Sequence, residues 1–106
     1  MGKGKLVIDP QQLRVAAAEA VGALKVLANT ERLLLLCQLS QGEMCVSDLE
    51  ELLEIRQPTL SQQLGVLRNE GVVATRREGK NIYYSVADPA LLEIVAVLYR
   101  LYCPEK

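Results

Sequence analysis

The chain has 106 residues, a net charge of −1 and no histidine. This length accommodates one domain, and the absence of histidine removes the Ser/His and Cys/His nucleophile pairs, so we expect no enzyme such as a thiol peroxidase or sulfurtransferase. No apolar run approaches the ~18 residues of a membrane span, and Met1–Pro10 lacks the apolar core of a signal peptide. We therefore expect a cytoplasmic protein that makes no membrane contact.

The first part of the chain predicts a tail and two helices. Residues 1–9 form a small basic segment that we expect to be flexible. Over residues 10–27, apolar side chains recur at helical spacing. Asn29 or Thr30 can cap the next helix, and Gly42 ends it. Because the core of this second helix, ERLLLLCQL, is apolar nearly all round, we expect it at the centre of the fold.

Residues 47–70 predict a helix-turn-helix. Ser47 and Glu50 have the spacing of a capping box, which would open the first helix of the pair. After a short turn, Pro58 suits the first position of the second helix, with Gln57 at its cap. Three leucines at i, i+4 and i+7 mark the buried side of this second helix: Leu60, Leu64 and Leu67.

A hairpin and a last helix complete the predicted fold. Residues 72–86 predict a two-stranded wing around the turn 78–81, and residues 88–102 predict a helix. This helix has more apolar surface than one small core can cover, although burial within one subunit is the alternative. We predict a mainly α fold with a small β-hairpin, namely a single winged helix-turn-helix domain over 10–106. It would form a homodimer through its first and last helices, 10–27 and 88–102.

The second helix of the pair and the wing carry the predicted DNA contacts. A recognition helix needs short polar side chains near its N-terminus, and wing cations add a salt-dependent attraction to phosphates. Residues 56–86 hold five cations and two carboxylates, a net charge of +3, so the rest of the chain is acidic. For each residue alone, the alternative is an ordinary solvated surface. We predict that these residues contact double-stranded operator DNA: Gln57, Thr59, Ser61, Gln62, Gln63, Arg68, Arg77 and Lys80, with Arg76 as a further wing cation.

Four segments resemble the ArsR/SmtB family of winged-helix bacterial repressors. They read LANTERLLLLCQL, CVSDLEELL, QPTLSQQLGVLRNEGVV and REGKNIYYSV, within about Leu24 to Val86. The resemblance implies a homodimer, paired through its first and last helices, on an inverted-repeat operator. It also implies that an inducer or a modification releases the DNA.

The resemblance gives the three cysteines different expected roles. The family's thiolate metal site would need a second thiol where Ser47 follows Cys45, and its other common site needs histidine, so we predict no metal and no cofactor. Cys37 and Cys103 stand where the persulfide-responsive branch of the family has two thiols that link within one subunit and lower DNA affinity. This likeness implies that Cys37 and Cys103 sense redox state and that reactive sulfur species are the inducer. Three alternatives stay open: a packing role for Cys37, a thiol-based As/Cd/Zn metalloregulator, and a DNA-binding module without a small-molecule inducer.

Overall fold

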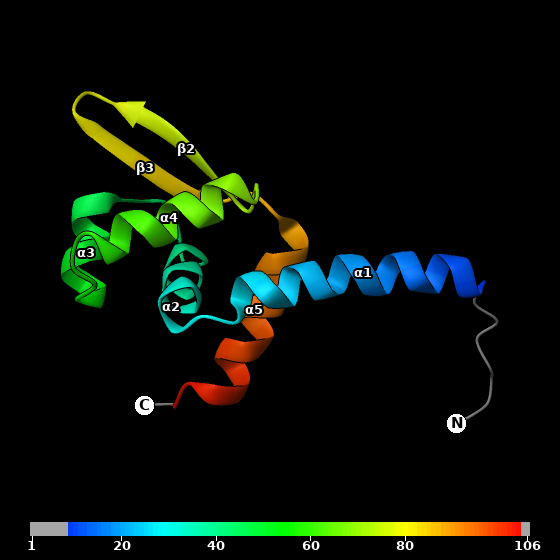
Figure 1. Ribbon diagram of the computed structural model, residues 1–106. Coiled ribbons are helices and arrows are strands. Elements are labelled where there is room, and N and C mark those ends of the chain that lie inside the picture. Colours follow the sequence, from blue (N-terminus) through cyan, green and yellow to red (C-terminus); the bar gives the residue numbers. More distant parts are fainter. Residues whose placement is uncertain (1–8, 105–106) are drawn as a thin grey trace.

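The computed structural model describes residues 9–104, which fold into five helices and a small antiparallel sheet (Figure 1). The predicted mainly helical, winged helix-turn-helix fold is confirmed. The tail predicted for residues 1–9 lies outside the described residues except for Asp9. In chain order the elements are α1 Pro10–Leu27, α2 Thr30–Leu39, β1 Met44–Cys45, α3 Val46–Leu53, α4 Thr59–Asn69, β2 Val73–Glu78, β3 Asn81–Val86 and α5 Pro89–Tyr102.

Helix α2 lies at the centre of the fold, as its apolar sequence predicts. It contacts α1, α3, α4, α5 and β3, and Leu35 and Leu36 on it are completely buried. Burying a leucine contributes about 1.5–3 kcal/mol to stability, so this helix is a major part of the core. The other buried core residues are Val26, Leu27, Leu39, Leu49, Ile55, Leu60, Leu64, Leu67, Val72, Val73, Tyr84, Leu91 and Val95.

Side-chain caps set the starts of three helices. Oxygen atoms of Asp9, Asn29 and Asp88 accept hydrogen bonds from first-turn backbone N–H groups of α1, α2 and α5, at 3.1, 3.0 and 3.0 Å respectively. These bonds satisfy donors that the helix itself leaves unpaired. Gly71 ends α4 with a φ of +75°, the left-handed conformation that favours glycine after a helix.

The predicted capping box at the start of the helix-turn-helix is wrong. Helix α3 begins at Val46, one residue before Ser47, and no side chain caps it. The Ser47 hydroxyl instead lies 3.3 Å from the Cys45 sulfur. Helix α4, in contrast, begins one residue later than predicted, at Thr59. Pro58 occupies the cap position and not the first position of the helix.

The wing forms as predicted, but the sheet contains one more strand. Strands β2 and β3 pair from Val73 opposite Val86 to Glu78 opposite Asn81, so the turn has only two residues. Gly79 takes the first of these with a φ of +63°, as tight hairpin turns of this kind require. Strand β1 pairs with the other side of β3. Two residues are too few to show alternation, so the sequence did not predict this strand.

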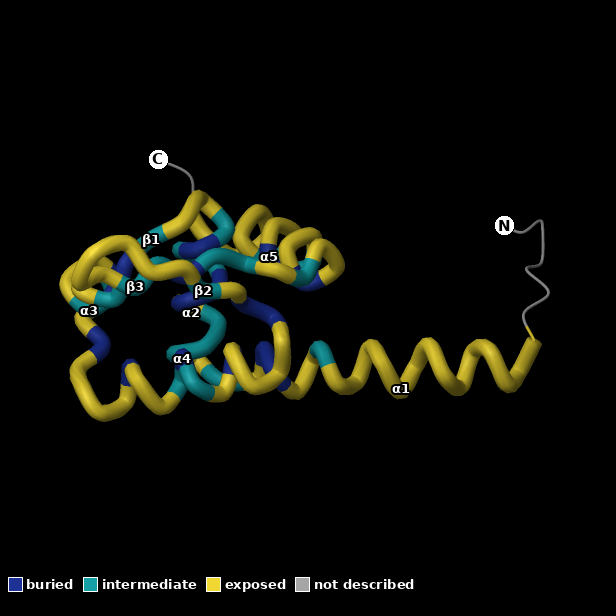
Figure 2. The backbone as a smooth tube through the Cα atoms, turned by 90° about the horizontal axis from the view of Figure 1, so that it is seen from above, coloured by how far each residue is buried: buried dark blue, intermediate teal, exposed yellow. Residues whose placement is uncertain are grey.

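Helix α1 extends away from the body of the molecule and packs on it only near its C-terminal end (Figures 1 and 2). Only Val26 and Leu27 of this helix are buried. Its apolar residues Leu13, Val15, Val21 and Leu24 are exposed. Of the helices described, none combines the length and apolarity needed to span a bilayer.

Candidate functional site

The exposed side of α4 is the candidate DNA-reading surface. Its three leucines face the core, and at about 100° per residue the opposite side of the helix carries Gln62. Asn69, seven residues further on, shares this side and was not predicted, although helical spacing alone points to it. Five of the predicted DNA-binding residues are exposed here or just before the helix: Gln57, Thr59, Ser61, Gln62 and Arg68.

Gln57 and Ser61 form one hydrogen-bonded unit at the start of α4. The Gln57 side-chain oxygen accepts from the Ser61 backbone N–H at 3.2 Å and from the Ser61 hydroxyl at 2.6 Å. The Gln57 amide group therefore keeps its two N–H donors for a DNA acceptor, whereas the Ser61 proton is already used. These bonds hold both side chains at the N-terminal end of the helix, where a groove-binding helix approaches base edges.

Gln63 lies differently from the other predicted contacts. It is half-buried, and its side-chain oxygen accepts a hydrogen bond of 2.8 Å from the Arg32 guanidinium. Arg32 comes from α2, which is far away in sequence, so no local pattern predicts this partner. The direct DNA contact predicted for Gln63 stays a prediction.

Of the three wing cations, Arg76 forms ion pairs, whereas Arg77 and Lys80 form none within residues 9–104. The Arg76 guanidinium contacts the Glu43 carboxylate at 2.8 and 2.9 Å and Glu78 at 2.8 Å, and it lies 4.7 Å from the centre of the Tyr83 ring. Its hydrogen bonds lower the pKa of Glu43 and raise that of Arg76. Arg76 therefore joins the wing to the segment before β1, and the attraction to DNA phosphates predicted for it stays a prediction.

Arg77 and Lys80 are exposed, and neither takes part in an ion pair within residues 9–104. Arg77 neighbours Arg76 on β2, and consecutive strand residues point to opposite faces, so its charge faces away from the Arg76 cluster. Lys80 occupies the turn at the end of the wing. Both charges are available to phosphates.

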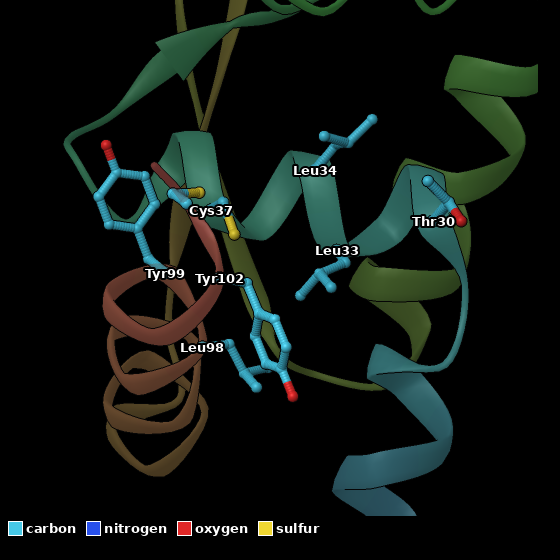
Figure 3. A pocket seen from close by; sticks show the side chains of 8 residues that line it. Thr30, Leu33, Leu34, Cys37, Leu98, Tyr99 and Tyr102 are labelled. Carbon is cyan, nitrogen blue, oxygen red and sulfur yellow. The ribbon is translucent and has the colours of Figure 1, made fainter. Parts of the chain in front are cut away.

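A second candidate site is an apolar pocket of about 300 Å³ between α2 and α5 (Figure 3). Figure 3 shows Leu98, Tyr99 and Tyr102 coming from α5, opposite residues of α2 that include Cys37. The sequence did not predict that the two tyrosines line a pocket, because their neighbours there come from another helix. The pocket is lined by Thr30, Leu33, Leu34, Cys37, Leu98, Tyr99, Tyr102 and Cys103. This lining contains no Asp, Glu, Lys or Arg.

The pocket brings together two of the three thiols. Cys37 is half-buried and Cys103 is exposed, and both are free. Burial raises the pKa of the Cys37 thiol, and repulsion between its thiolate and that of Cys103 adds to the increase. Cys45 is buried elsewhere, beside a hollow lined by Ser47 and Lys80. Within the described chain, no three Cys, Asp or Glu side chains gather in a group able to hold a metal ion.

The fold and the exposed polar helix define a winged-helix DNA-binding protein. A family model described as "Bacterial regulatory protein, arsR family" matches residues 29–75. The biofilm growth-associated repressor of Agrobacterium fabrum is 52% identical over 91 residues, which are 85% of this chain and 78% of that protein. The chain therefore belongs to the arsR family of bacterial regulatory proteins. It is a DNA-binding transcriptional repressor and not an enzyme.

Solved structures agree with this assignment. The crystal structure of the repressor BigR from Xylella fastidiosa has a TM-score of 0.84 at 41% identity and covers 92% of this chain and all of that one. A structure described as reduced HlyU from Vibrio cholerae has a TM-score of 0.84 at 38% identity, covering 89% of this chain and 99% of that one.

Two substitutions test the division between base reading and phosphate attraction. Gln62→Ala is expected to weaken binding to a selected duplex by about 1–3 kcal/mol with little effect on random DNA, whereas Lys80→Ala should weaken both and reduce the salt slope by about one. Fluorescence anisotropy over a series of salt concentrations measures both effects. Gln41→Ala, at an exposed glutamine between α2 and β1, is the control and should change neither. Equal losses of Gln62→Ala on selected and random DNA would contradict base reading.

Proposed function

We propose that the protein is a homodimeric repressor that binds inverted-repeat operator DNA while Cys37 and Cys103 are reduced. Reactive sulfur species link the two thiols and release the DNA. The observation that carries this proposal is the shared pocket, because Cys37 on the central helix and Cys103 at the end of α5 line the same cavity. A packing role explains one half-buried thiol, but it does not explain a second, exposed thiol beside it.

The exposed Cys103 is the first nucleophile. Its thiolate attacks the outer sulfur of a low-molecular-weight persulfide, RSSH, which gives a Cys103 persulfide and releases RSH. The Cys37 thiolate then attacks Cys103 Sγ, the inner sulfur of this persulfide, which forms the disulfide and releases the outer sulfur as hydrosulfide. Two thiols are oxidised and one sulfane sulfur is reduced, so electrons balance. If a second RSSH first converts Cys37 to a persulfide, attack between the two persulfides gives a trisulfide and one hydrosulfide.

A bond between these thiols would act on DNA binding through helix geometry. Cys37 lies on α2, which packs against the recognition helix α4, and Cys103 directly follows α5. In a dimer paired through α1 and α5, a changed angle between α2 and α5 changes the distance between the two recognition helices. Half-site spacing on the duplex is a strict geometric requirement, so such a change lowers specific affinity.

Exposed apolar residues on α1 and α5 support the homodimer. Leu13, Val15, Val21 and Leu24 on α1 lie uncovered, as do Leu92, Val97, Tyr99, Leu101 and Tyr102 on α5. So much apolar surface on two helices is typical of an interface between subunits. Relatives add independent support for redox control, since one solved relative is named for its reduced form.

Mass spectrometry combined with DNA binding tests the proposal. After treatment with a small-molecule persulfide, we expect a Cys37–Cys103 link within one chain. The disulfide is two hydrogens lighter than the dithiol, and each sulfur atom inserted into the bridge adds its mass to that of the disulfide. Affinity for a selected inverted-repeat duplex should fall about 10- to 100-fold, the usual range of allosteric coupling. If stoichiometric thiophilic metal displaces the DNA while persulfide leaves it bound, the protein is a metalloregulator and the proposal is wrong.

A further inference from the structure

Arg32 makes hydrogen bonds to two other helices. Its Nε donates to the Val26 carbonyl at 2.7 Å, its Nη2 donates to the Lys25 carbonyl at 3.2 Å, and its Nη1 donates to the Gln63 side-chain oxygen at 2.8 Å. The residue is half-buried in the first turn of α2. One guanidinium thus connects the end of α1, the start of α2 and the middle of α4.

The bonds to α1 meet a need of that helix. The last carbonyl groups of a helix lack the usual backbone donor four residues further on, and the Lys25 carbonyl accepts only a 3.3 Å bond from the Ala28 N–H in its place. The negative end of the helix dipole also favours a cation there. Arg32 supplies both hydrogen bonds and charge to this end. Because α1 otherwise extends away from the body, these contacts help to set its direction.

The bond to Gln63 constrains the rotation of α4. Gln63 follows Gln62, so about 100° of helix rotation separates the inward-held side chain from the one at the centre of the exposed side. A guanidinium is planar and presents its donors in a rigid fork, so holding two carbonyls of α1 fixes where the third donor points. The direction of Gln62 relative to α1 is therefore coupled to Arg32.

We propose that Arg32 is a positioning residue that sets the recognition helix α4 relative to the dimer helix α1, and that Gln63 serves operator recognition through Arg32 and not through a base contact. This inference rests on the DNA-binding function and on dimerisation through α1. It does not depend on the sulfur switch, since every measurement uses the reduced protein.

Four variants test the inference: Arg32→Met, Gln63→Leu, the double variant, and Gln63→Glu, which keeps the acceptor. The readout is the ratio of affinity for a duplex selected by the wild type from a random library to affinity for a random duplex of equal length. We expect Arg32→Met and Gln63→Leu each to lower this ratio by about tenfold, and the double variant to lower it no further, because both remove the same link. Gln63→Glu should keep the ratio near that of the wild type, since an added charge affects both duplexes alike.

A second measurement compares affinities for two duplexes that differ only in half-site spacing. A general loss of stability lowers both affinities alike and leaves their ratio unchanged. The wild type should reject a selected duplex with one base pair inserted between its half-sites, whereas Arg32→Met should discriminate less between the two spacings. Thermal unfolding of each reduced variant tests whether it is folded. If Arg32→Met is unfolded, the comparison of Gln63→Leu with Gln63→Glu tests the inference in its place. Additive losses in the double variant, or equal losses from Gln63→Glu and Gln63→Leu, overturn the inference and assign Gln63 to the DNA. A wild type that selects no duplex would instead refute operator binding itself.

Discussion

Serine in place of Cys37 or Cys103 is expected to leave operator binding intact and to abolish its loss on persulfide treatment. Serine is close to cysteine in size, and both positions have access to the pocket, so the reduced fold should persist. If either thiol is missing, the link between α2 and α5 cannot form. Persulfide treatment should then leave DNA affinity unchanged, whereas it lowers that of the wild type about 10- to 100-fold. Titration of a selected duplex before and after treatment measures this difference.

Cys45→Ser is the matched control for both variants. Cys45 lies outside the thiol pocket, so this variant should release DNA as the wild type does. Persulfide-driven release that survives Cys37→Ser or Cys103→Ser would rule out the two-thiol switch.

Formation of the bond between Cys37 and Cys103 should accelerate as pH rises. The raised pKa of Cys37 means that this thiol is mostly protonated at neutral pH, and only the thiolate is nucleophilic. The fraction of thiolate, and with it the rate of the second step, increases until the pH exceeds that pKa. Stopped samples analysed by mass spectrometry follow the step as conversion of the Cys103 persulfide to the bridged form.

Charges on the exposed side of α1 should give the second large effect. Leu13 and Val21, 52% and 48% exposed, lie on one side of this helix, where Leu13→Glu with Val21→Glu would bury like charges in the proposed interface. We expect a folded monomer with about 100-fold or greater loss of operator affinity, because the second half-site no longer benefits from the first. Light scattering and DNA titration measure the two outcomes.

Leu52→Glu provides the comparison for that experiment. Leu52 is 57% exposed on α3, outside both proposed dimer helices, so this variant should remain dimeric. Circular dichroism should show helix content near that of the wild type for all variants, since exposed positions contribute little to the core. A Leu13/Val21 double variant that stays dimeric would remove α1 from the interface.

The helices were predictable because their signals are local. Asn29 and Asp88 cap the helices that follow them, and Gly71 ends α4, all through contacts within a few residues. The capping box failed for a local reason too, since the chain enters α3 directly from β1 and the helix begins before Ser47. Strand β1 escaped prediction because it depends on pairing with β3, about forty residues later.

From its sequence alone, the chain could be assigned the winged helix-turn-helix fold, the leucines that bury α4 and the polar residues on its exposed side. Periodicity and capping chemistry act over a few residues, so they can be read without a structure. Only the tertiary structure decided that Arg76 is paired with Glu43, that Gln63 is held by Arg32, and that Cys37 and Cys103 share a pocket. Each of these contacts joins residues far apart in the chain, and their meeting depends on how the helices and strands pack against one another.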